Sequence, residues 1–77
     1  MIEILINEFD WVSNRKRLNV IVNKLMVVGW KRFGNNGTVV FFKDIPLEEA
    51  KNEIKVLGIP EVEPEEWYEE LYSNHIF

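Results

Sequence analysis

The chain has 77 residues, of which 47% are hydrophobic and 13% aromatic, and it contains no cysteine. This length predicts one small domain over residues 1–77, and the composition is too apolar for a disordered chain. The lack of cysteine excludes disulfides and thiolate metal sites, and no apolar run approaches the ~20 residues of a membrane span, so we expect a cytoplasmic protein that does not enter a membrane.

Charge is distributed unevenly along the chain. Residues 1–43 carry seven basic and three acidic side chains, a net charge of +4, and residues 44–77 carry two basic and ten acidic side chains, a net charge of −8. The two halves sum to the formal net charge of −4. This separation is the strongest functional signal in the sequence.

A strand and a helix are predicted in the first third of the chain. Ile2, Ile4 and Ile6 alternate with other residues, which is typical of a strand with at least one buried face. A helix is expected after Ser13, which suits an N-cap, and Gly29 suits the position just beyond the helix end. Its apolar residues at helical spacing are Leu18, Ile21, Val22, Leu25 and Val28.

A β-hairpin is predicted next, with strands at about 30–33 and 38–43. They flank Gly34-Asn35-Asn36-Gly37, and Asn36 or Gly37 is expected to have a positive φ. The second strand is apolar on both faces, so we expect it to be central in the sheet.

A second helix is expected from Pro46 to about Gly58, with an apolar stripe of Leu47, Ala50, Ile54 and Leu57. Residues 60–77 are predicted to be an acidic linker followed by a third helix from Glu65 to about His75. One face of this third helix carries Glu65, Glu66, Glu69 and Glu70, and the other carries Trp67, Tyr68, Leu71, Tyr72 and His75.

The predicted order is β-α-β-β-α-α. It indicates an α+β domain with a three-stranded antiparallel or mixed sheet and helices packed on one face, a partial ferredoxin-like arrangement. The order of strand, acid, basic helix and Gly-Trp resembles the small ferredoxin-like nucleases of CRISPR adaptation over roughly residues 2–57, through Asp10, Arg17 and Gly29-Trp30. The resemblance implies that Asp10 helps to hold a divalent metal between two protomers. Local chemistry offers the alternative that Asp10 starts a turn or helps to cap the first helix.

Other catalytic chemistry finds little support. His75 is the single histidine and has neither an oriented partner for a general base nor a coherent set of zinc ligands. No glycine-rich loop suits a phosphate, and neither serine lies in a nucleophile motif. We therefore expect a protein that is not an enzyme and binds no cofactor and no metal.

A basic cluster could contact nucleic acid, with Trp30 and Phe33 adding stacking. It consists of Arg15, Lys16, Arg17, Lys24, Lys31 and Arg32. The pI of about 4.9 and the acidic second half oppose direct nucleic-acid binding. The favoured interpretation is that these basic side chains face solvent at one end of the first helix and pair with the acidic tail of the same chain.

The acidic segment offers two interpretations, a solvated helix face or a surface that imitates the charge of a nucleic-acid backbone. In size, charge and lack of catalytic residues the chain is similar to small phage-encoded inhibitors, including anti-CRISPR and other anti-defence proteins. The sequence thus predicts an inhibitor of a nucleic-acid-processing enzyme. The expected partner-binding residues are Glu61, Glu63, Glu65, Glu66, Glu69 and Glu70, together with Trp30 and Phe33.

Two further functions remain open at this point. One is the metal-dependent nuclease-like dimer that uses Asp10, and the other is a structural or dimerisation module. A homodimer is also expected because Val20 and Val27 lie on the side of the first helix opposite Leu18 and Leu25, where the chain's own core cannot cover them.

Overall fold

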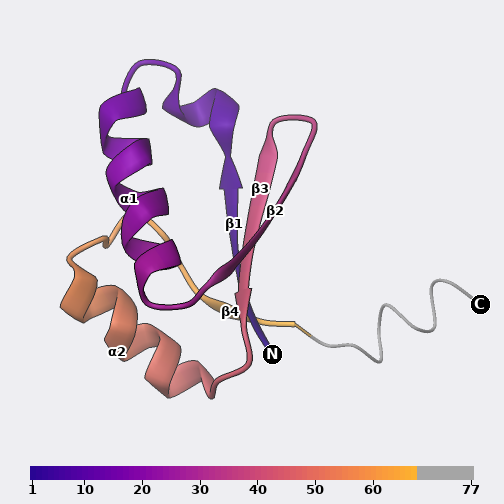
Figure 1. Cartoon of the computed structure of the whole chain (residues 1–77), viewed down its shortest axis with the longest axis vertical. Helices are drawn as coiled ribbons and strands as arrows, with labels where there is room; N and C mark the ends of the chain where they lie inside the picture. Colours follow the sequence, from indigo (N-terminus) through magenta and orange to yellow (C-terminus); the bar gives the residue numbers. More distant parts are fainter. Residues whose placement is uncertain (68–77) are drawn as a thin grey trace, which may run out of the picture.

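The computed structural model of the chain describes residues 1–67, without the side chain of Asn35. Its elements are β1 (Ile2–Asn7), the 3-10 helix η1 (Glu8–Trp11), α1 (Arg15–Val27), β2 (Lys31–Asn35), β3 (Thr38–Lys43), α2 (Leu47–Leu57) and β4 (Glu65–Glu66). The strands form one antiparallel sheet in the order β2-β3-β1-β4 (Figure 1). The α+β class and the antiparallel sheet are confirmed, but the sheet has four strands where the sequence predicted three. None of the helices within residues 1–67 has the length and apolar character needed to cross a membrane.

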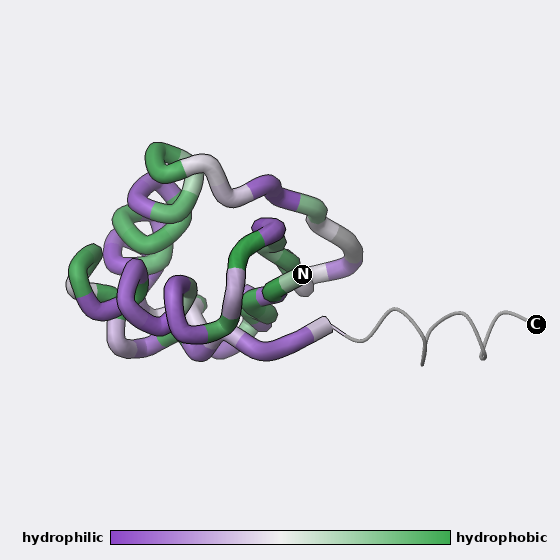
Figure 2. Tube along the Cα trace, turned by 90° about the horizontal axis from the view of Figure 1, so that it is seen from below, coloured by the Kyte–Doolittle hydropathy of each residue, from purple (hydrophilic) through white to green (hydrophobic). Residues whose placement is uncertain are grey.

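The core lies between the two helices and one face of the sheet. β1 contributes its three alternating isoleucines, and the register places Phe41 opposite Ile4 and Val39 opposite Ile6 on the same face. Both helices lie on that side of the sheet (Figure 1), and their traces alternate between polar and apolar residues (Figure 2). The helix residues buried there are Leu18, Ile21, Leu25, Ala50 and Ile54. One-sided helix packing therefore follows from the predicted apolar stripes.

Each α-helix ends at a glycine in the left-handed region and turns the next residue into the core. Gly29 follows α1 with φ of 96°, and Gly58 follows α2 with φ of 68°. In both cases two successive amides donate hydrogen bonds back to carbonyls of the last turn, as in a Schellman motif. As a result Trp30 and Ile59, the residues after these glycines, are 3% and 0% exposed.

The β2–β3 hairpin is confirmed, although β2 continues to Asn35, two residues beyond its predicted end, so the turn is shorter than predicted. Asn36 and Gly37 both have positive φ, 47° and 85°, which suits a tight two-residue turn. β3 lies between β2 and β1, so it is an interior strand as expected. A Cβ atom at Gly37 would also collide with the ring of Phe9 in η1, so this turn packs against the segment that follows β1.

Two predicted boundaries differ from the structure. The N-cap of α1 is Asn14, not Ser13, and its side chain makes no capping hydrogen bond. The prediction of a third helix starting at Glu65 is wrong at that point, because Glu65 and Glu66 form β4. They pair with Glu3 and Ile2 of β1. This pairing gives the outer edge of β1 backbone partners, which a helix beginning there could not supply. Residues 68–77, with the remainder of the predicted helix, lie outside the described residues.

Candidate protein-interaction surface

The second face of the sheet is apolar, and neither helix covers it. The side chains of β1 and β3 that alternate with the core residues point to this side, and the register places Leu5 beside Val40 and Val40 beside Phe33. A cavity of about 420 Å³ lies over it. We call this surface the open face; its lining residues are Met1, Glu3, Leu5, Phe33, Val40, Phe42 and Trp67.

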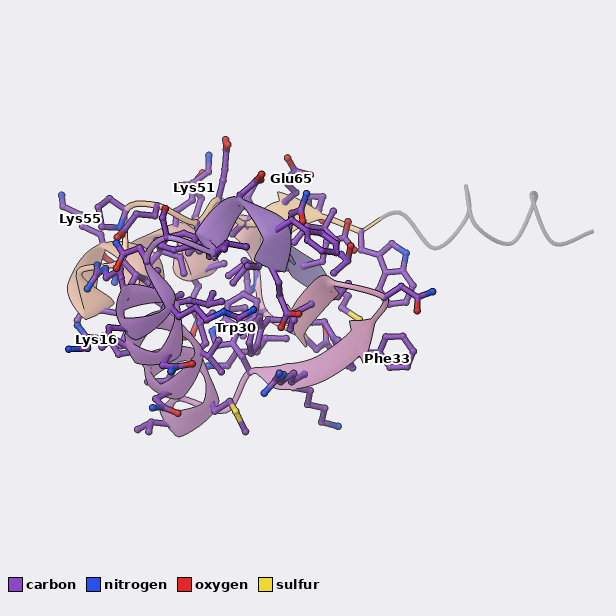
Figure 3. The ribbon with its side chains drawn as sticks, turned by 90° about the horizontal axis from the view of Figure 1, so that it is seen from above. Lys16, Trp30, Phe33, Lys51, Lys55 and Glu65 are labelled. Carbon is purple, nitrogen blue, oxygen red and sulfur yellow. The ribbon has the colours of Figure 1, made fainter. Side chains whose placement is uncertain are left out.

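The open face exposes large apolar side chains that adjoin one another. Met1 is 46% exposed, Leu5 57% and Phe33 62%. In Figure 3, Phe33 projects from the hairpin on the side away from α1. Single exposed apolar residues are ordinary, but a contiguous group rimmed by charges is typical of an interaction site.

A row of charged residues crosses the open face from one edge of the sheet to the other. Glu65 of β4 lies opposite Glu3 of β1, Glu3 lies opposite Phe42 of β3, and Phe42 lies opposite Lys31 of β2. Burial raises the pKa of Glu3, and the neighbouring Glu65 carboxylate adds to this rise. The row is therefore acidic at the β4 end and basic at the β2 end, on either side of an apolar centre.

Trp30 is buried, so it does not belong to this surface. Its indole lies between the helices and the sheet (Figure 3), and its Nε1 donates a hydrogen bond of 3.1 Å to Glu53 Oε1. Lys43 Nζ donates to both oxygens of Glu53, at 3.0 and 2.9 Å, and to the Val28 carbonyl at 2.7 Å. Of the two aromatic residues predicted to contact a partner, the structure places only Phe33 at the surface. The signal for burial was the position of Trp30 directly after the helix-ending Gly29.

Glu61 is engaged within the chain. Its carboxylate accepts hydrogen bonds from Arg17 Nε at 2.5 Å and Nη2 at 3.0 Å, and Arg17 Nη2 also donates to the Gly58 carbonyl at 2.8 Å. Hydrogen bonding from Arg17 lowers the pKa of Glu61 to about 2. The guanidinium thus joins the start of α1 to the turn after α2, and Glu61 is not a free carboxylate.

The remaining described carboxylates of the predicted site lie along β4 and the residues before it. Glu63, Glu65 and Glu66 are exposed, and none forms an ion pair with another residue of the 1–67 range. We call these three residues the acidic edge. Glu65 points to the open face because it pairs with Glu3, whereas Glu66 pairs with the core residue Ile2 and points to the other side. Glu69 and Glu70 lie outside the described residues.

Two residues of the predicted basic cluster form contacts within the chain. Arg17 binds Glu61, and Lys24 Nζ donates to the Leu57 carbonyl at 2.7 Å. These two contacts agree with the interpretation that the bases serve their own chain. The exposed members are Arg15, Lys16, Lys31 and Arg32.

Asp10 lies in η1 and is exposed. The residue that caps this short helix is Asn7, whose Oδ1 accepts the Phe9 N–H at 3.0 Å. Within residues 1–67, no group of three or more histidine, cysteine, aspartate or glutamate side chains is arranged to hold a metal ion. A metal at Asp10 would therefore need ligands beyond this part of the chain.

Comparison of the chain with protein-family models, with curated proteins and with solved structures gives no match. The surface chemistry of the domain is therefore the basis for assigning a function.

Proposed function

We propose that this chain is a small non-enzymatic binding protein that acts by occupying the surface of a partner protein. The acidic edge is the part that meets the partner. The observation that carries this proposal is the exposure of three neighbouring carboxylates, Glu63, Glu65 and Glu66, which have no cationic partner in the described part of the chain.

The position of the acidic edge favours a basic partner. It lies at the β4 end of the sheet, whereas the exposed bases Lys31 and Arg32 lie on β2, the edge strand at the opposite end. Glu65 and Glu66 point to opposite sides of the sheet, so the carboxylates form a negative edge, which is separate from those bases. Such a surface can raise association rates with an oppositely charged groove by about 10- to 1000-fold at low salt.

Basic grooves of this kind are characteristic of enzymes that bind a nucleic-acid backbone. The partner class that we propose is therefore a nucleic-acid-processing enzyme, and the mode of action is competition with its substrate, as for the phage-encoded anti-CRISPR and anti-defence inhibitors. Competition of this type weakens as salt screens the exposed charges.

The test is a charge reversal with a matched control. The variant Glu63→Lys/Glu66→Lys reverses two carboxylates of the acidic edge, and Glu48→Lys/Glu49→Lys reverses two exposed carboxylates of α2 with the same change in net charge. Each protein is used for affinity capture from a host lysate, and the captured enzyme is then assayed for displacement of its nucleic acid.

We expect the acidic-edge variant to lose most of the capture and displacement, and the α2 variant to retain both. Both variants should stay folded, because exposed charges contribute only ~0–1 kcal/mol each. Equal capture by the acidic-edge variant and the unmodified protein would refute this function.

The nuclease-like dimer is the second candidate, and one observation favours it. The element order β-α-β-β-α-β in an antiparallel sheet resembles that of ferredoxin-like domains without matching it fully, because the fourth strand has only two residues; Asp10 lies in η1, just after β1. Cleavage of DNA or RNA that requires Mg²⁺ or Mn²⁺ and is lost in Asp10→Ala would establish this candidate. Equal nucleic-acid integrity with both proteins would eliminate it.

A further inference from the structure

We propose that the open face is the interface of a homodimer in which the two sheets pack face to face about a twofold axis parallel to the strands. This inference goes beyond the proposed function. In the dimer Glu65 faces the second copy, so the carboxylates of the acidic edge that remain for a partner protein are Glu63 and Glu66, the two that the capture test reverses and that do not line the open face.

The apolar side chains at the centre of the open face would be more stable if another protein surface covered them. Leu5 and Phe33 are 57% and 62% exposed, and Val40 and Phe42 lie between them in the interior strand β3. A domain of this size gains stability from each apolar side chain removed from water. Two such sheets can pack with their inner faces about 10 Å apart, with strand directions aligned to within about 30°.

The charged residues on the open face indicate that the molecule packing on it is a second copy of this chain. The row across the sheet runs from Glu65 through Glu3 and Phe42 to Lys31. A twofold axis parallel to the strands exchanges the β4 edge with the β2 edge. Lys31 of each copy then faces Glu65 of the other, and Leu5 of each copy faces Val40 of the other. The surface is complementary to itself.

The same row selects between the two face-to-face arrangements. A twofold axis across the strands would place the acidic β4 end of one copy against the β4 end of the other, and the basic β2 end against the β2 end, which is unfavourable. Burial is the larger cause of the raised pKa of Glu3, and repulsion from the adjoining Glu65 carboxylate adds to it. An ammonium group facing them relieves this repulsion, so the axis parallel to the strands is the favoured one.

The first experiment measures mass by sedimentation of the full chain and of two variants. The unmodified protein should sediment at twice the 9.2 kDa mass of one chain. Phe33→Glu should sediment as a monomer, since it replaces a large apolar side chain of the interface by a charged one. Val27→Glu is the control: Val27 is 84% exposed on α1, on the other side of the sheet, and its variant should remain a dimer. Circular dichroism melting checks that each variant is folded.

A monomeric unmodified protein at millimolar concentration would overturn the proposal. Dissociation by Val27→Glu together with a persistent dimer of Phe33→Glu would also overturn it, and would place the interface on α1.

The second experiment tests the orientation and does not depend on Phe33. Lys31→Glu and Glu65→Lys each create two like-charge contacts in the homodimer, so each should weaken dimerisation by about tenfold or more. An equimolar mixture restores both pairs in the heterodimer, which should form with the affinity of the unmodified dimer. A mixture that associates no more tightly than its components would refute the proposed axis. Failure of either experiment leaves the partner-capture test unaffected.

Discussion

Replacing Glu53 by alanine should destabilise the domain far more than an ordinary substitution on a helix. The change removes the acceptor of the Trp30 indole N–H and two acceptors of Lys43 Nζ. Lys43 Nζ retains its hydrogen bond to the Val28 carbonyl. A buried N–H left without a partner costs about 1–3 kcal/mol. The side chains of Lys43 and Glu53 are 23% and 21% exposed, so water partly replaces the lost carboxylate and we add only about 1 kcal/mol for the ion pair.

The expected loss is therefore about 2–4 kcal/mol, from a total stability of about 4–12 kcal/mol for a chain of this length. It corresponds to a fall in melting temperature of roughly 10 °C or more. Urea unfolding followed by circular dichroism measures the loss directly. Glu49→Ala, an exposed position of the same helix, is the matched control and should change the free energy of unfolding by less than about 0.5 kcal/mol.

The double variant Glu53→Ala/Lys43→Met should lose less than the sum of its single variants, because it leaves no stranded ammonium group. Glu53→Ala and Glu49→Ala with equal stabilities would refute this account of the network. Such a result would also reopen the assignment of Trp30 to the core.

Two further predictions concern the turn after α2 and the hairpin. The lowered pKa of Glu61 means that its bond with Arg17 contributes stability above the usual pKa of 4.5, and that this contribution is lost as the pH falls toward about 2. The stability gap between the unmodified protein and Glu61→Gln, measured by urea unfolding, should therefore be constant near neutral pH and close over that range; an unchanged gap at pH 2 would contradict the assignment. Gly37→Ala should lower stability by about 1–2 kcal/mol because φ is 85° there, whereas Gly34→Ala, which has no positive φ and open space around it, should be nearly neutral in the same thermal melts. Equal melting temperatures for the two variants would show that the turn does not require glycine at position 37.

The sequence predicted the elements that depend on local patterns. The alternation in β1, the helical spacing in α1 and α2, and the glycine–asparagine turn of the hairpin are each confirmed. β4 could not be predicted in this way. It is two glutamates long, and it is a strand because Glu65 and Glu66 pair with Glu3 and Ile2 at the other end of the chain. The amphipathic pattern that continues beyond Glu66 favoured a helix instead.

The candidate surface was only partly predictable. Glu63, Glu65, Glu66 and Phe33 were named from the sequence and are exposed, and their contact with a partner stays a prediction. Trp30 lies beside two exposed bases in the sequence, which suggested a surface position, but its backbone completes the end of α1 and its ring enters the core.

The open face as a whole was not predicted, although a signal for it exists. β3 is apolar on both faces while the helices are expected on only one, so the combination already implies an uncovered apolar surface. Identifying its members required the register, because Leu5, Val40 and Phe33 come from three strands.

The sheet order has a consequence for how the chain folds. β1 is synthesised before the other three strands of this sheet, yet it is an interior strand whose neighbours are β3 and β4, from the middle and the far end of the described chain. Until the hairpin closes, the isoleucines of β1 have no strand to pair with, and an unpaired apolar strand can recruit another chain. The hairpin, by contrast, needs only local contacts and can form early. Productive folding therefore requires β3 to pair with β1 before the strand of another molecule does. Variants that slow hairpin closure should aggregate during refolding even where the stability of the native state is almost unchanged.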